Sequence, residues 1–118
     1  MKTVLIIDDE EDMRKYLGKL ITRLGFNVLT AEDGKTGIEL CKSEKADCVF
    51  LDIKLPDANG NEIFKSIKEI DDKTKVFIVS GDAHEVHKMH ILDMASADAY
   101  LVKPFSLDEI AGLLEGIK

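Results

Sequence analysis

Apolar residues along the chain recur in two patterns that alternate from one end to the other. Short unbroken apolar runs, rich in Val, Ile and Phe, are typical of strands buried on both faces of a sheet. Longer segments place apolar residues three and four positions apart, which indicates amphipathic helices. The unbroken runs predict strands at residues 3–7, 26–31, 47–52, 75–80 and 99–102.

The segments between and after these strands are predicted to be helices, and some carry signals at their ends. Gly25 is typical of the residue that follows a helix, so the first helix is expected to stop there. Ser106 and Glu109 have the spacing of a capping box that begins the last helix. The apolar stripe is weakest at residues 84–95, where a helix is still expected.

Five strand-then-helix units follow one another with no long linker, low-complexity stretch or internal repeat. This alternation predicts an α/β fold in which helices cover both faces of a parallel sheet. Because crossovers between parallel strands are right-handed, the sheet is expected to be doubly wound. A chain of 118 residues is long enough for one hydrophobic core, so we expect a single domain over residues 1–118.

Polar residues stand where the predicted strands end. Asp52 comes directly after the apolar run of the third strand, and Asp8 and Asp9 follow the first. Ser80 ends the fourth strand and Lys103 follows the fifth. The carboxyl ends of parallel strands lie at one edge of the sheet, where open α/β folds bind their ligands. The sequence therefore predicts that these five side chains converge.

The predicted cluster has the residue types that phosphoryl transfer needs. Its three carboxylates repel one another and suit a hard divalent cation such as Mg²⁺. Asp52 is a candidate nucleophile, and Mg²⁺ with Lys103 would neutralise the oxygens of the transferring group. Simpler roles stay open: Asp8 and Asp9 as acids that favour a helix N-terminus, Ser80 as a helix cap, and Lys103 as a solvated lysine.

Composition narrows the classes of partner and compartment. A net charge of −7 argues against nucleic acid as a direct partner, because phosphate binding needs clustered Lys and Arg. No apolar run approaches the roughly 20 residues of a membrane span, so we expect no membrane partner and a cytoplasmic location. Cys41 and Cys48 lack the spacing of metal ligands and are expected to be buried, reduced thiols.

Five motifs in order carry a resemblance to a known family. They are Asp8-Asp9, Asp52 with Pro56 and Gly60, Ser80-Gly81, Tyr100, and Lys103-Pro104-Phe105. Together they resemble the receiver domain of bacterial two-component response regulators, over the whole chain. The resemblance implies a flavodoxin-like (βα)5 fold with strand order 2-1-3-4-5. Because Met1 directly precedes the first strand, we expect a stand-alone, chemotaxis-receiver-like domain, with an excised domain as the alternative.

The resemblance also implies roles for individual residues. A sensor histidine kinase or a phosphotransfer protein is expected to phosphorylate Asp52. Asp9, Asp52 and the backbone carbonyl of Lys54 are expected to hold Mg²⁺, with Asp8 assisting. Lys103 is expected to bind the phosphoryl group. Such a domain catalyses only its own phosphorylation and dephosphorylation and is otherwise not an enzyme.

Ser80 and Tyr100 resemble the switch pair through which receivers report phosphorylation. Their signal is expected at the surface formed by residues 84–95, the strand at 99–102 and the last helix, where a downstream protein target would bind. The chain departs from the family at two positions. Ser80 stands where many relatives have threonine, which keeps the hydroxyl, and Ser96 stands where a glycine commonly ends the preceding helix.

Two further groups of residues are candidates for tuning or for partner binding. Lys54 and Asp82 are predicted to overhang the site, where an ion pair would hinder the water that hydrolyses the acyl phosphate. The alternative is that Asp82 caps the helix at residues 84–95. The other group is His84, His87 and His90, whose positions drift around that helix. We expect these histidines on a solvated or partner-binding face rather than at a metal.

Three other classes of protein compete with the receiver interpretation. A haloacid-dehalogenase-like phosphatase also uses a strand-end aspartate, but it needs a second acid where this chain has Lys54. A flavin-binding flavodoxin must cradle phosphate in its first loop, which the acids at residues 8–12 would repel. An interaction module that never accepts phosphate is the third alternative, and the complete set of site residues argues against it.

Overall fold

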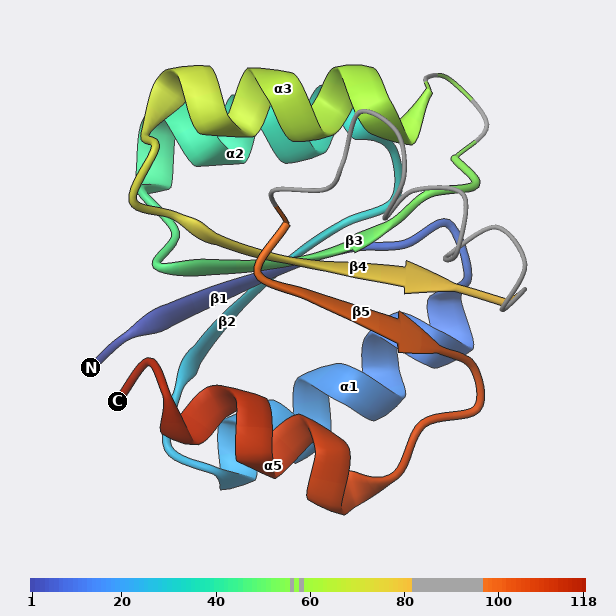
Figure 1. The fold of residues 1–118 in the computed structure, drawn as a ribbon, viewed down its shortest axis with the longest axis vertical. Coiled ribbons are helices and arrows are strands. Elements are labelled where there is room, and N and C mark those ends of the chain that lie inside the picture. Colours follow the sequence, from blue (N-terminus) through green and yellow to red (C-terminus); the bar gives the residue numbers. More distant parts are fainter. Residues whose placement is uncertain (56, 58, 82–96) are drawn as a thin grey trace.

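A five-stranded parallel sheet with helices on both faces makes up the fold (Figure 1). The structure is a computed structural model that describes residues 1–55, 57, 59–81 and 97–118. The strands lie in the order β2-β1-β3-β4-β5, so the predicted doubly wound α/β fold and its strand order are confirmed. The elements are β1 (Thr3–Ile7), α1 (Glu11–Arg23), β2 (Asn27–Ala31), α2 (Gly34–Glu44), β3 (Cys48–Asp52), α3 (Gly60–Ile70), β4 (Lys75–Ser80), β5 (Ala99–Val102) and α5 (Leu107–Glu115).

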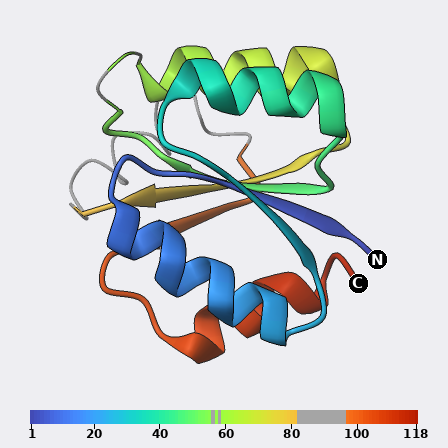
Figure 2. The same cartoon turned by 180° about the vertical axis from the view of Figure 1, so that it is seen from behind.

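The helices divide the core into two layers. α1 and α5 cover one face of the sheet, and α2 and α3 cover the other (Figures 1 and 2). Successive residues of a strand point to opposite faces, so each strand supplies both layers. Phe50 of β3, for example, packs on the α1/α5 side, whereas its neighbour Leu51 packs on the α2/α3 side.

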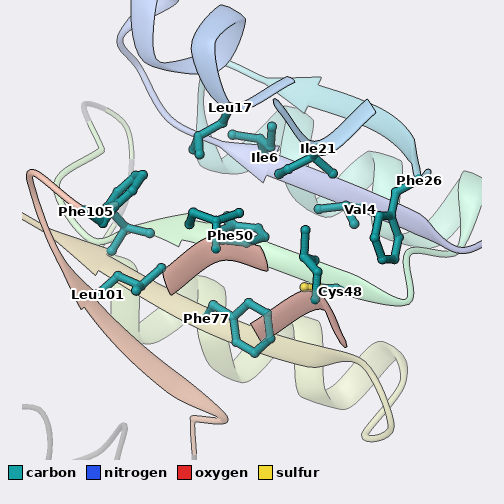
Figure 3. Packing of buried hydrophobic residues seen from close by; sticks show 13 residues of the cluster. Val4, Ile6, Leu17, Ile21, Phe26, Cys48, Phe50, Phe77, Leu101 and Phe105 are labelled. Carbon is teal, nitrogen blue, oxygen red and sulfur yellow. The ribbon is translucent and has the colours of Figure 1, made fainter. Parts of the chain in front are cut away.

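β3 is the central strand, and all five of its residues are buried. Its Phe50 packs edge-to-face on Phe77 of β4, with ring centroids 5.2 Å apart and planes at 79° (Figure 3). Aromatic pairs in this geometry add about 0.5–1.5 kcal/mol to the free energy gained from burial alone. The strand that ends in Asp52 is therefore stabilised by this contact with β4 as well as by its pairing with β1 and β4.

The predicted signals at the helix ends are present. Gly25 follows α1 with φ of 97°, a left-handed conformation that favours glycine. The capping box of α5 is complete, because the Ser106 hydroxyl accepts the Glu109 N–H while the Glu109 carboxylate accepts the Ser106 N–H. Asp33 caps α2 by accepting the N–H of Thr36 at 2.8 Å.

Two predicted strand boundaries are wrong by one residue, and both errors have a physical reason. The N–H of Phe26 donates to the backbone carbonyl of Ile21, so Phe26 belongs to the turn after α1 and β2 begins at Asn27. The side chain of Asp47 accepts the N–H of Thr3 at 2.8 Å, and β3 begins at the next residue. Strand propensity does not register either contact, because both depend on the backbone of another segment.

The close approach of α2 to the sheet depends on one glycine. A Cβ added at Gly37 would lie 2.5 Å and 2.9 Å from side-chain carbons of Ile7. α2 therefore packs directly on β1 at a distance that only glycine permits. Its N-terminus, at the same edge of the sheet as the predicted site, is consequently fixed relative to β1.

Several predictions concern segments that the structure does not describe. The helix expected at residues 84–95, its three histidines, Ser96 and Asp82 lie outside the described residues. Within the described part of the chain, no helix combines the length and apolar character that crossing a membrane requires. Cys41 and Cys48 are free and buried, as predicted, and burial raises the pKa of the Cys41 thiol to about 11.

Candidate phosphoacceptor site

Three charged side chains converge at the carboxyl edge of the sheet because they continue the same alternation as the core. Asp8, Asp52 and Lys103 each lie two positions after a residue of the α1/α5 layer, namely Ile6, Phe50 and Leu101. Positions two apart along a strand point to the same face. The strands thus aim two carboxylates and one ammonium into the same space, from β1, β3 and β5.

The path of the chain after β5 fixes the position of Lys103. Leu101 on one side of it and Phe105 on the other are both buried in the α1/α5 layer (Figure 3). The N–H of Lys103 donates to the carbonyl of Ser80 at 2.7 Å, which continues the pairing of β5 with β4. Only 17% of the Lys103 side chain is exposed, so the lysine is directed into the site rather than into solvent.

The Lys103 ammonium contacts three carboxylates. Its Nζ lies 3.3 Å from Asp8 Oδ2, 3.3 Å from Glu10 Oε1 and 3.4 Å from Asp52 Oδ2. Asp8 and Asp52 are buried, whereas Glu10 is largely exposed. The two buried carboxylates interact more strongly with the ammonium, because solvent screens the exposed ion pair with Glu10.

Backbone N–H groups fix the second oxygen of each buried carboxylate. Asp8 Oδ1 accepts the N–H of Glu10 at 2.9 Å, and Asp52 Oδ1 accepts the N–H of Lys54 at 3.0 Å. Each carboxylate is therefore oriented by one backbone donor and one ammonium. The Asp8 backbone carbonyl also accepts a hydrogen bond from Arg14 of α1 at 2.7 Å, which ties the loop after β1 to the helix.

Four acids gather closely enough to share one cation. Carboxylate oxygens of Asp8, Asp9, Glu10 and Asp52 all lie within 4.8 Å of one another. Oxygen ligands at this density suit a hard divalent ion, and one lysine does not balance four negative charges. The donor set therefore fits Mg²⁺. Glu10 was missed from the sequence, although its place in the acidic run after β1 was a usable signal.

The electrostatics of Asp52 reflect this crowding. The pKa of its carboxyl is raised to about 6. Burial is the largest cause, opposed by the Lys54 N–H, while the Asp8 carboxylate raises the pKa further and the Lys103 charge lowers it. Burial alone would lower the pKa of the Lys103 ammonium, but Asp52 and Asp8 raise it above its ordinary value. Lys103 therefore stays charged at neutral pH.

Ser80 and Tyr100 lie on the opposite face of the sheet from this cluster of charges. Ile78 of β4 pairs with Tyr100 of β5, and Ser80 pairs with Val102. Ile78 and Tyr100 both pack in the α2/α3 layer, and Ser80 shares their face because it lies two positions after Ile78. Ser80 is completely buried and Tyr100 is half-buried. Burial raises the pKa of the Tyr100 phenol, opposed by the Ala97 backbone.

Of the five side chains that were expected to converge, the structure brings together those of Asp8, Asp9, Asp52 and Lys103, whereas Ser80 lies on the opposite face of the sheet. Lys54 lies beside Asp52, with its N–H in the site and its residue largely exposed. Asp82 lies outside the described residues, so the predicted Lys54–Asp82 pair stays a prediction. Two hollows lined by described residues lie away from this site, one along α1 and β2 and the other at the amino end of the sheet.

The sequence of the chain matches one family model, the response regulator receiver domain, over residues 4–115. The chain belongs to the response regulator receiver family. The resemblance drawn from the five motifs is therefore confirmed. Membership favours the receiver interpretation over the dehalogenase-like and flavin-binding alternatives.

Known receivers and response regulators resemble this one along its whole length. The response regulator ArlR of Staphylococcus aureus is 32% identical over 117 residues, which cover 99% of this chain and 52% of ArlR. The receiver thus spans about half the length of the curated relatives it matches. ArlR shows that close relatives of this domain occur within longer response regulators.

Solved structures agree in fold. The response regulator TrrA of Thermotoga maritima, in complex with Mg²⁺ and BeF, is 29% identical with a TM-score of 0.90 and complete coverage of both chains. A CheY-like receiver from Methanospirillum hungatei is 26% identical with a TM-score of 0.89, covering 98% of this chain and 92% of that one. The BeF3-activated receiver domain of DrrB is 28% identical with a TM-score of 0.84, over 99% and 97%.

Proposed function

We propose that this receiver is a phosphorylation-dependent signalling switch in which Asp52 accepts the phosphoryl group. The observation that carries the proposal is the position of Asp52. Its buried carboxylate lies at the end of the central strand, 3.4 Å from Lys103 and inside a cluster of acids. The match to the receiver family and the complex of TrrA with Mg²⁺ and BeF support it.

The residues of the chain suit each part of the transfer. An oxygen of Asp52 attacks the phosphorus of a phosphohistidine or a small donor, forming a P–O bond as the bond to the leaving group breaks. The leaving group keeps the electron pair and takes its proton from solvent. Lys103 attracts the charged oxygens of the transferring group, which raises the rate without a general base.

We propose Asp8, Asp9 and Asp52, with the backbone carbonyl of Lys54, as the residues that hold Mg²⁺. When bound, the ion supplies positive charge that offsets the repulsion between phosphoryl oxygens and carboxylates. Asp8 is buried and oriented by the Glu10 N–H, so it is positioned before any cation arrives. The carboxylate of Glu10 is close enough to contribute as well.

The signal is proposed to leave the site through Ser80 and Tyr100. They lie on neighbouring strands and on the same face, so movement of one side chain changes the space open to the other. Ser80 is the last residue of β4, so its hydroxyl would turn around the end of the strand to donate a charge-assisted hydrogen bond to the phosphoryl group, and Tyr100 would then shift between two positions. The proposed partners are a histidine kinase or phosphotransfer protein before the switch and a protein target after it, in the cytoplasm.

Binding of beryllofluoride, a mimic of the phosphoryl group, tests the proposal. With Mg²⁺ present, we expect changes in the amide NMR signals of Asp52, Lys54 and Lys103, and also of Ser80 and Tyr100. Changes confined to the metal site, with β5 silent, would contradict the switch. No change at all would leave the phosphate-independent interaction module, and steady turnover of p-nitrophenyl phosphate would instead indicate a phosphatase.

A further inference from the structure

Asp57 makes a contact between two segments that are far apart in sequence. It belongs to the loop between β3 and α3, and its carboxylate reaches the first turn of α2. Oδ1 accepts the N–H of Gly34 at 2.9 Å, and Oδ2 accepts the N–H of Lys35 at 3.1 Å. Both carboxylate oxygens accept a hydrogen bond, so one side chain binds two adjacent backbone N–H groups.

The first turn of α2 provides a fixed attachment point. Helix N-termini leave N–H groups without intrahelical partners. In α2 the local cap Asp33 satisfies only Thr36, and Asp57 satisfies Gly34 and Lys35. The first turn of α2 contains no acid of its own, so the charge of Asp57 also complements the helix dipole. Because Gly37 packs α2 directly on β1, the helix end cannot easily follow the loop.

The other end of the same loop forms part of the candidate site. Lys54 follows Asp52 by two residues, and its N–H donates to Asp52 Oδ1. A bridge between Lys54 and Asn59 closes the base of the loop. Gly60 packs so tightly on Ile53 that an added Cβ would lie 2.9 Å from the Ile53 Cα. The loop is thus attached at two places, to α2 through Asp57 and to the candidate site through Lys54.

We infer that Asp57 is a positioning residue, which anchors the β3–α3 loop to α2 and thereby holds the Lys54 backbone in place for Mg²⁺. The inference rests on the proposed function for its metal, but the anchor itself does not. The exposed carboxylate keeps its charge, because the Gly34 and Lys35 N–H groups lower its pKa. Among the described residues, the hydrogen bonds of the Asp57 carboxylate go to the first turn of α2 and not to Asp8, Asp9 or Asp52, so Asp57 would act only through the loop.

Two variants of Asp57 and one matched control test this anchor in the full chain. Asp57→Ala removes both hydrogen bonds, whereas Asp57→Asn keeps one acceptor oxygen. Asp33→Ala removes the local cap of the same helix end and serves as the control for general loss of α2 stability. Solvent exchange of the backbone amides is measured by NMR without metal, and Mg²⁺ affinity is measured by calorimetric titration with MgCl₂.

For Asp57→Ala we expect faster exchange at Gly34, Lys35 and also Lys54, and Mg²⁺ binding about tenfold weaker. Asp57→Asn should fall between this variant and the wild type. Asp33→Ala should change exchange at Thr36 while leaving Lys54 exchange and Mg²⁺ affinity unchanged. At saturating Mg²⁺, the rate at which acetyl phosphate phosphorylates Asp57→Ala should return to within about twofold of the wild-type rate. The substitution is expected to weaken Mg²⁺ binding only, and a saturating concentration compensates for that loss.

Unchanged Lys54 exchange in Asp57→Ala would overturn the inference, and so would an equal loss of Mg²⁺ affinity in Asp33→Ala. A slow phosphorylation that persists at saturating Mg²⁺ would also overturn it, because Asp57 would then act on the transfer itself. If the wild type binds no Mg²⁺, the part of the proposed function that assigns a Mg²⁺ site is contradicted. Exchange at Lys54 then decides alone whether the loop is anchored.

Discussion

At the scale of single residues, the site is a balance of charges that costs stability. Asp52 and Asp8 are both buried, and one ammonium lies between them. Burial disfavours the charged carboxylate, and the nearby Asp8 carboxylate adds to this effect, which is why the pKa of Asp52 is raised to about 6. A protein optimised only for stability would not keep this arrangement, and a site poised to receive a cation and a phosphoryl group requires it.

The sign of the effect on stability follows from the pKa of Asp52. The folded protein binds this proton more tightly than the unfolded chain, where the pKa is 3.8. The contribution of Asp52 to the free energy of unfolding therefore falls as pH rises from about 4 to about 6, and it stays unfavourable above that range. We expect Asp52→Asn to stabilise the metal-free protein by about 1–3 kcal/mol near pH 8.

Urea denaturation in EDTA measures this gain, which should vanish as pH falls below about 4. Added Mg²⁺ should stabilise the wild type and leave the variant nearly unchanged. Asp72→Asn, at an exposed position of the loop after α3, is the control and should change stability by less than about 0.5 kcal/mol. A loss of stability in Asp52→Asn near pH 8 would mean that Asp52 is not under electrostatic stress.

At the scale of elements, close packing and backbone contacts decide what the sequence pattern does not show. The prediction of β1, β4 and β5 matched the structure to the residue, because each is an unbroken apolar run between polar segments. The boundary error at Phe26 arose from a hydrogen bond back to the end of α1, and the error at Asp47 from a hydrogen bond to the distant β1. Asp57 was missed for the same reason, since its partners lie more than twenty positions earlier.

The packing of α2 on β1 gives a prediction with opposite signs at two helical glycines. Gly37→Ala should destabilise the protein by about 1–3 kcal/mol, because its Cβ would overlap Ile7 and force the helix outward. Gly112→Ala in α5 should stabilise it by about 0.5–1 kcal/mol, because in the described part of the chain no atom outside the adjacent helix backbone lies within 4 Å of the added Cβ, and alanine favours a helix.

Thermal unfolding of both variants provides the measurement. Ile7→Val, combined with Gly37→Ala, should recover part of the loss by removing a methyl group from the contact. Equal effects of the two alanine substitutions would contradict the close approach of α2 to β1.

At the scale of the whole molecule, the strands carry the hydrophobic core along their length and the candidate site at their carboxyl ends. The positions of Asp8, Asp52 and Lys103 were predictable, because strand ends and alternation follow from the sequence. Their individual contacts were not predictable, since these depend on the conformation of the loops above the sheet, whereas Glu10 could have been suspected from its place in the acidic run after β1. The receiver interpretation needed the ordered motifs together, as each motif alone is common.

The central claim is that Asp52 accepts a phosphoryl group with the help of Mg²⁺. The most direct measurement is mass spectrometry of the protein after incubation with acetyl phosphate and Mg²⁺. We predict one added phosphoryl group, removed by alkali or hydroxylamine as an acyl phosphate should be, on the peptide that contains Asp52. The label should be absent in Asp52→Asn and when EDTA replaces Mg²⁺. Equal labelling of Asp52→Asn, or a label that survives hydroxylamine, would contradict the account.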